Sequence, residues 1–343
     1  MTRRRLIRLF GWGLALAAAG AAAPEGPQIP RVHYIDLYGT GKITAARILR
    51  EAKLETGQPL PASKGDLEER INQIAGISRV RVEAICCEGP DAVLFVGVEE
   101  KDGPRVSFRS EPMGKSVLPA DLVDHYQQFV ETVAKAVEQK ISSDQVEISL
   151  ANAAHGFEAE FTAFADEHAP LLRDVLRNTD DAEQRAIAAA VIGYAPKKAA
   201  VADDLQYALQ DPDETVRGNA MRSLKALAIA GVRDSSLGIR ISPTWLIELL
   251  NSLVLNDRLQ AADLLLILSD QRETAVLDQM RQRALPSLAE MARWETLRYA
   301  LPPFLLVGRI AGFDEEEIQR LWSSGEREIV IQRALGKPGA RRK

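Results

Sequence analysis

The stretch from Asp204 to Ala228 reads D-L-Q-Y-A-L-Q-D-P-D-E-T-V-R-G-N-A-M-R-S-L-K-A-L-A. Apolar residues recur in it at helical spacing on both sides of an Asp-Pro-Asp sequence, so the pattern predicts two helices joined by a tight corner. The two stripes comprise Leu205, Ala208 and Leu209, and then Val216, Ala220, Leu224 and Leu227. A helix pair cannot bury both stripes alone, so the stretch predicts a stack of similar pairs.

The corner itself contains Asp211, Pro212 and Asp213. We expect Asp211 to cap the second helix and Pro212 to occupy its first turn, where proline loses no hydrogen bond. Val216 begins the second stripe, and Arg217 is placed to reach back to the carboxylates or carbonyls of the corner. These residues are therefore predicted to build the corner and not a catalytic site.

An arginine recurs at the same place in the neighbouring pairs. Arg185 precedes Arg217 by 32 residues, close to the period of helical repeats, and Arg258 follows Arg217 by 41 residues. The longer interval predicts an insertion at Val232–Ile241. The repeated pattern covers residues 168–335, which we expect to form an all-α array.

The array resembles HEAT repeats, in particular the HEAT-like subtype that also occurs in bilin lyases. The resemblance is carried by D-P-D-E-T-V-R at Asp211–Arg217 and by the following Ala220 and Leu224. It implies a curved helical solenoid with a concave face, which is usually a scaffold for binding proteins.

Residues 30–103 predict a smaller α+β unit before the array. Alternating residues predict strands at Val32–Leu37, Val80–Ile85 and Val93–Val98, and two helical segments lie between the first and second strands. Ser63 is a candidate N-cap for the second helix. The expected order is β-α-α-β-β, with the last two strands forming a hairpin.

This unit resembles a POTRA (polypeptide-transport-associated) domain, of a kind also found in division-septum proteins of the bacterial envelope. The matching features are the turn at Gly39, G-Q-P-L at Gly57–Leu60, G-I-S-R-V-R-V at Gly76–Val82 and V-G-V-E-E at Val96–Glu100. The resemblance implies a periplasmic location and binding of extended segments at a sheet edge. No β-barrel sequence follows, as it would in a membrane translocator.

Residues 1–23 have the layout of a signal peptide. Arginines come first, then an apolar run of about 15 residues and several Ala-x-Ala sites. The stretch Thr2–Arg8 also resembles a twin-arginine export signal, so either general secretion or twin-arginine export is expected, with an uncleaved anchor as the alternative. The mature protein is predicted to be periplasmic or secreted, and to touch a membrane only peripherally or through an uncleaved leader.

The charge balance argues against nucleic acid as a partner. The net charge is −5, whereas binding to phosphate backbones requires clustered positive charge. The remaining basic cluster is Gly336–Lys343, which is predicted to be a disordered tail.

The connecting region, residues 104–167, is predicted to be mainly helical. Val106–Phe108 is expected to extend the preceding sheet, and Asn152–Gly156 is expected to break the helical pattern. Phe157, Phe161 and Phe164 share one helical face, which indicates either a core stripe or a ligand groove.

Isolated residues with possible chemistry do not form a recognisable set. Cys86 and Cys87 are adjacent, and they are interpreted as strand residues, with a strained disulfide or a metal pair as alternatives. The stretch Gly39–Lys42 resembles part of a phosphate loop but lacks the flanking Gly and Ser/Thr. The histidines lack metal-site spacing, although acidic residues near two of them leave a metal site open; they are His33, His125, His155 and His168.

The sequence thus predicts no catalytic residue, no cofactor and no metal. The leading interpretation is a non-catalytic scaffold that binds envelope proteins through a strand edge and a concave helical face. One alternative is a bilin-lyase-like or other small-molecule enzyme with an aromatic groove, and another is a structural component of a division or outer-membrane assembly machine. The aromatic residues considered for the groove are Phe157, Phe161, Trp245, Trp294 and Trp322.

Overall fold

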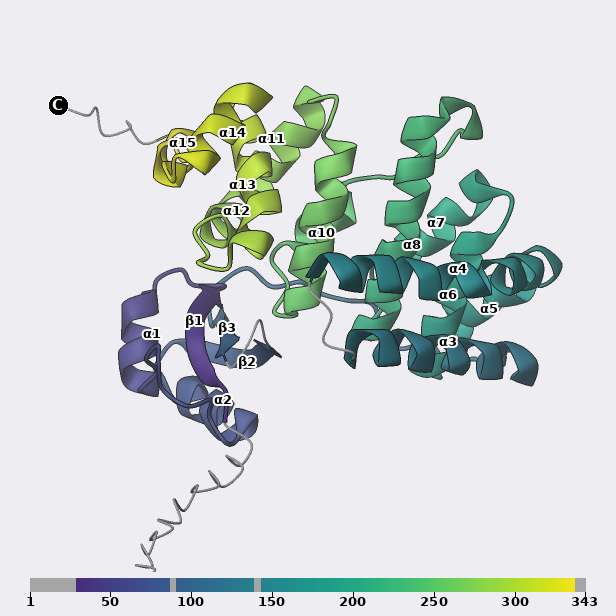
Figure 1. Cartoon of the computed structure of the whole chain (residues 1–343), viewed down its shortest axis with the longest axis horizontal. Helices are drawn as coiled ribbons and strands as arrows, with labels where there is room; N and C mark the ends of the chain where they lie inside the picture. The colour runs from purple at the N-terminus through teal and green to yellow at the C-terminus, as the bar shows by residue number, and fades with distance from the viewer. Residues whose placement is uncertain (1–28, 87–90, 139–142, 337–343) are drawn as a thin grey trace, which may run out of the picture.

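The computed structural model describes residues 29–86, 91–138 and 143–336 (Figure 1). The chain is α+β: a small three-stranded sheet with its helices comes first, and many helices follow. We call residues 29–102 the small unit and residues 169–336 the helical array. The predicted leader, Cys87 and all but the first residue of the basic tail lie outside the described residues.

The small unit has the β-α-α-β-β order that its sequence pattern predicts. The N-terminus of its second helix is capped by Ser63, whose side chain accepts a hydrogen bond from the backbone of Asp66. The central strand of the sheet is the last in sequence; it runs parallel to the first strand and antiparallel to the second. The elements are β1 (Arg31–Tyr38), α1 (Ala45–Ala52), α2 (Lys64–Asn72), β2 (Ile77–Cys86) and β3 (Asp91–Glu100).

Both faces of this sheet are buried. Leu37 and Leu94 point into the small unit's own core beneath α1 and α2. Their neighbours Tyr38 and Phe95 point to the opposite face and belong to the core of the helical array. Because successive strand residues alternate between faces, β1 and β3 join two separate cores.

The helices of the array lie in a row, as the run of colour from teal to yellow in Figure 1 shows. Along the row, α6 packs on α8, α8 on α10, α10 on α13 and α13 on α15. The helices from the connecting region onward are α3 (Ala120–Glu138), α4 (Ser143–Glu167), α5 (Ala169–Asn178), α6 (Ala182–Val191), α7 (Lys198–Ala208), α8 (Glu214–Arg233), α9 (Thr244–Leu249), α10 (Leu255–Leu268), α11 (Thr274–Arg283), α12 (Leu285–Met291), α13 (Leu297–Ala311), α14 (Glu315–Ser323) and α15 (Arg327–Ala334).

The connecting region differs from its prediction in two places. Residues 103–118, which we call the strap, contain no helix, and Val106–Phe108 does not join the sheet. The strap instead crosses the corners of the array, where Phe108 lies 3.9 Å from the guanidinium of Arg217. The predicted break at Asn152–Gly156 is absent, since α4 runs through it. A single glycine costs a helix only about 1 kcal/mol, so Gly156 does not end α4.

Candidate functional site: corner arginines, docking surface and cleft

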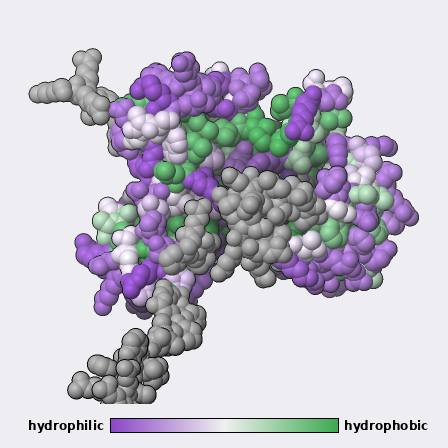
Figure 2. Space-filling view, in the orientation of Figure 1, coloured by the Kyte–Doolittle hydropathy of each residue, from purple (hydrophilic) through white to green (hydrophobic). Residues whose placement is uncertain are grey.

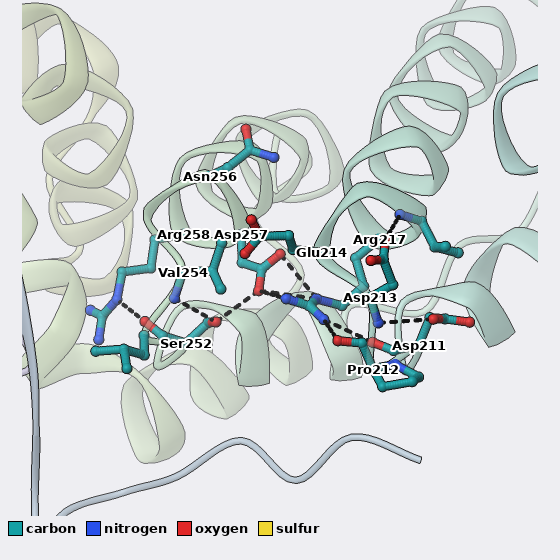
Figure 3. A network of polar contacts seen from close by, with 12 residues as sticks. Asp211, Pro212, Asp213, Glu214, Arg217, Ser252, Val254, Asn256, Asp257 and Arg258 are labelled. Carbon is teal, nitrogen blue, oxygen red and sulfur yellow. Dashed lines mark hydrogen bonds and ion pairs between the residues drawn. The ribbon is translucent and has the colours of Figure 1, made fainter. Parts of the chain in front are cut away.

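Three arginines anchor three successive corners of the array. Each guanidinium donates to the backbone carbonyl six residues earlier in the chain, and this bond closes the turn between two helices. The first bond runs from Arg185 Nη1 to Thr179 at 2.9 Å. The other two run from Arg217 Nη1 to Asp211 at 2.8 Å and from Arg258 Nε to Ser252 at 2.5 Å (Figure 3). The predicted reach of Arg217 to corner carbonyls is therefore present.

The first two arginines also pair with a carboxylate of the following helix pair. Arg185 binds both oxygens of Asp211, at 2.9 and 3.0 Å. Arg217 binds Asp257 in the same way, with its shortest contact at 2.7 Å (Figure 3). All four side chains are at most 1% exposed. We refer to these four residues and Arg258 as the arginine ladder, in which the two arginine–carboxylate pairs each fix one helix pair against the next.

Asp211 does not cap α8, contrary to the prediction. The N-cap is Asp213, whose side chain accepts from the backbone of Thr215 and Val216. Asp211 lies two residues earlier and accepts from the backbone of Asp213 at 3.0 Å, while Pro212 lies in the corner before the helix. Both carboxylate oxygens of Asp211 accept hydrogen bonds from Arg185, and Asp213 caps the helix instead. Val216 is fully buried, as its place in the apolar stripe predicts.

The strap adds a second layer over these corners. Arg109 donates through its backbone to Gln210 at 3.0 Å, and its side chain pairs with Asp211. Farther along, Gly114 donates to the carbonyl of Asn178 at 2.7 Å and accepts from Asp180 at 2.9 Å. The corners of the array thus already hold an extended segment of this chain by backbone hydrogen bonds.

The third arginine of the ladder lies where the small unit meets the array. The guanidinium of Arg258 is 4.8 Å from the ring of Tyr38, and the Tyr38 hydroxyl donates to the carbonyl of Leu253 at 3.0 Å. Gly97 allows this placement, because a Cβ atom there would lie 2.4 Å from the Tyr38 ring. Burial lowers the pKa of Arg258, and the negative charge of Glu290 opposes that shift.

The turn after β1 is held by two carboxylates. Glu290, from α12, accepts from the backbone of Gly39 at 2.7 Å and from both the backbone and the hydroxyl of Thr40. Glu100, from β3, accepts from the next three backbone N–H groups, those of Gly41, Lys42 and Ile43, at 2.8–2.9 Å. The backbone N–H groups of Gly39–Lys42, the stretch that resembles part of a phosphate loop, therefore all donate to carboxylates of the same chain.

Further bonds complete the docking of the small unit on the array. Asp36 accepts from the backbone of Glu295 and Thr296, at 2.8 and 3.1 Å, at the start of α13. The indole of Trp294 donates to the carbonyl of Leu37 at 2.8 Å. Arg81 of β2 makes a bidentate pair with Glu214 of α8, at 2.6 and 2.8 Å. The docking surface consists of these contacts and those of Tyr38 and Glu290.

A cleft of about 590 Å³ lies beside this docking surface. One wall comes from the small unit, where α2 and the residues Ser78–Arg81 of β2 line it. The other wall comes from Leu253 and Val254, in the loop before α10. The cleft therefore exists only while the two units are docked.

The two edges of the sheet differ. The edge at β1 is covered by the chain itself: Val32 exchanges backbone hydrogen bonds with Gln58 and Gly57, at 2.8 and 2.7 Å. At the β2 edge, the backbone N–H of Val82 donates to the side chain of Glu68 at 2.7 Å. The β2 edge is thus capped at one point by a side chain, and it faces the cleft.

The aromatic residues proposed for a groove lie in the hydrophobic core or pack against it. Phe161 and Trp294 are 1% and 3% exposed, and Trp294 packs against Tyr38 and Phe95 of the small unit. The remaining three pack against the core from separate elements; they are Phe157, Trp245 and Trp322. Phe161 and Trp294 are therefore core residues.

The other isolated candidates also remain apart. Within the described ranges no group of three or more His, Cys, Asp or Glu side chains could hold a metal ion. The histidines lie near single carboxylates, for example His155 near Glu158 at 2.9 Å. Cys86 is the last residue of β2. None of the helices in the described part of the chain is long and apolar enough to span a membrane.

No family model matches this sequence, and a comparison with curated proteins gave no match.

Several residues of the docking surface escaped the sequence analysis. Glu290, Glu100 and Asp36 look like ordinary surface carboxylates in the sequence, and their partners lie far away in the chain. One signal was available for the turn: Gly39–Lys42 offers several backbone N–H groups in a row, and such a run favours an anion. The anion is an internal carboxylate.

Replacing Arg217 with Ala is expected to destabilise the protein by about 3–5 kcal/mol, because it leaves Asp257 buried without its partner. Urea unfolding of the variant measures this change. The matched control is Arg293→Ala, which removes an exposed pair with Glu328 and should cost less than about 1 kcal/mol. Equal losses in the two variants would contradict a structural role for the ladder.

The turn predicts a dependence on pH. Burial acts to raise the pKa of Glu100, but its three backbone hydrogen bonds outweigh burial, so this pKa lies below its usual value of 4.5. A lowered pKa in the folded state stabilises the protein above the usual value, and the stabilisation is lost as the pH falls through the folded value.

Glu100→Gln should therefore reduce the free energy of unfolding at pH 7 and make a smaller difference at pH 3, where a larger fraction of the wild-type side chain is protonated. Denaturant titrations at the two pH values test this, with the exposed Glu111→Gln as the control. A loss of the same size at both pH values would show that the charge of Glu100 does not hold the turn.

Proposed function

We propose that this protein is a non-catalytic adaptor of the bacterial cell envelope, periplasmic or secreted after export, which holds other proteins on a rigid platform. The observation that carries the proposal is the strap. The array binds this extended segment through backbone bonds to Gln210 and Asn178, which is a way of recognising polypeptide without regard to most side chains.

The internal pairing of the charged residues supports a binding role over a catalytic one. The ladder pairs Arg185 and Arg217 with carboxylates of the same chain. In the turn after β1, Glu290 and Glu100 accept hydrogen bonds from the backbone. A catalytic group must instead reach a substrate. The groups with the most unusual surroundings here are those that hold the fold together.

Two surfaces are offered for partners. The first is the β2 edge, in keeping with the resemblance of the small unit to POTRA domains. The second lies on the array, which resembles HEAT repeats: Figure 2 shows apolar surface gathered over the region of α8, α10 and α13. Ile229 and Val232 of α8 are 37% and 72% exposed. Exposed apolar patches of this kind commonly mark protein-binding sites.

The proposal is tested by affinity capture from envelope extract with the whole chain as bait. We expect specific envelope proteins to be retained, and the double variant Ile229→Lys, Val232→Lys to lose those that bind the array. Met113→Lys, at an 88% exposed position on the strap, is the control and should retain them all.

The N-terminus of the exported protein is mapped in the same preparation and is expected near residues 20–26. Retention of no protein above the background of the matrix would contradict the adaptor role, and an N-terminus still at Met1 would favour the uncleaved anchor.

A further inference from the structure

The cleft between the small unit and the array has one wall made of strand and one made of helix corner. Val80 and Arg81 of β2 lie on the first wall, and Leu253 and Val254 lie on the second. Arg81 also joins the small unit to α8 of the array through its bidentate pair with Glu214. The distance between the walls is therefore set by the docked arrangement.

The strand wall presents backbone groups to the cleft. The N–H of Val82 points away from β3, since it donates to Glu68. Residues two apart on a strand point to the same side, so the N–H and C=O groups of Val80 also point away from β3. Val80 lines the cleft, so these groups can pair with an extended segment placed in it.

The wall formed by Leu253 and Val254 lies at the third corner of the array, and the first two corners bind the strap. At the first two corners, the carbonyls that accept from the backbone of the strap belong to Asn178 and Gln210. Both lie seven residues before a ladder arginine, and Asn251 occupies the same place before Arg258. The strap crosses only the first two corners, and the cleft lies at the third.

The charged and apolar side chains that line the cleft indicate which peptide segment would fit it. Four of the five charged residues that line the cleft have partners: Lys64 pairs with Glu68 at 3.6 Å, Arg79 pairs with Glu99 at 3.6 Å, and Arg81 pairs with Glu214. The fifth is Glu69. The apolar residues that line the cleft are Val80, Leu253 and Val254, of which Leu253 is 7% exposed, and the rest of the lining is polar or charged. An extended segment with apolar residues at alternate positions fits this arrangement, because every second side chain then faces the same wall.

We propose that the cleft binds an extended peptide segment of a partner protein, which pairs with β2 through Val80 and packs its alternate apolar side chains on Leu253 and Val254. This inference rests on the proposed adaptor function and adds that the helical array supplies half of the site.

The test uses a display library of random dodecapeptides, panned on the whole purified chain. The recovered peptides are expected to alternate apolar and polar residues. Their binding should weaken at least tenfold in Val80→Pro, which removes the backbone N–H at an edge position that tolerates proline. It should weaken at least tenfold also in Val254→Lys, and stay unchanged in Val130→Lys, a control at a 46% exposed valine of α3. Circular dichroism and unfolding curves confirm that each variant is folded.

The possible results separate the two proposals. Peptides that lose affinity for Val80→Pro but bind Val254→Lys as well as wild type would overturn the composite cleft and leave strand-edge binding intact. Peptides that bind both variants as tightly as wild type, or that repeat with a helical period, would overturn binding of an extended segment in the cleft. Recovery of no specific peptide would count against the cleft and against strand-edge binding by the proposed adaptor, while capture through the array surface would remain a separate result.

Discussion

A buried guanidinium must have a partner, and this requirement organises the array. Arg185 and Arg217 are almost fully buried, so each would impose a large desolvation cost without a carboxylate and a carbonyl in reach. The carbonyl comes from the arginine's own corner and the carboxylate from the next helix pair. Each pair can therefore take only one position against its neighbour. The apolar stripes supply the driving force for stacking, and the ladder fixes its register.

The ladder continues into the small unit at Arg258. There the aromatic ring of Tyr38 lies beside the guanidinium. The negative charge of Glu290 favours the charged form of Arg258, and the same carboxylate accepts from the backbone of Gly39 in the turn after β1. In the opposite direction, Asp36 of the small unit accepts from the backbone N–H groups of Glu295 and Thr296, just before α13. The two units exchange acidic side chains and backbone donors in both directions. This reciprocity gives the sheet a fixed orientation on the array, and with it the cleft along β2.

The parts of this arrangement that sequence could predict are the local ones. The corner, the apolar stripes and the recurring arginines follow from spacing within about 40 residues, and the order of elements in the small unit follows from alternation and turn residues. Asp257, Glu290 and Asp36 could not be assigned, because nothing local distinguishes a buried carboxylate from a surface one. Trp294 was considered for a ligand groove for the same reason: its partner, Leu37, lies 257 residues away. The predicted cap at Asp211 was wrong because the pairing with Arg185 outweighs a local preference. Binding, export and partners stay predictions, since they depend on molecules outside this chain.

Whether the small unit and the array behave as one body is measured most directly by native-state hydrogen exchange. Four backbone N–H groups report on the docking surface: those of Gly39 and Thr40, held by Glu290, and those of Glu295 and Thr296, held by Asp36. If docking is a single cooperative interaction, all four should exchange with nearly the same free energy of opening, close to that of the central strand β3. Exchange of these four groups at a much lower free energy than β3 would show that the units part independently, and a cleft formed between them could not then be a permanent feature of the protein.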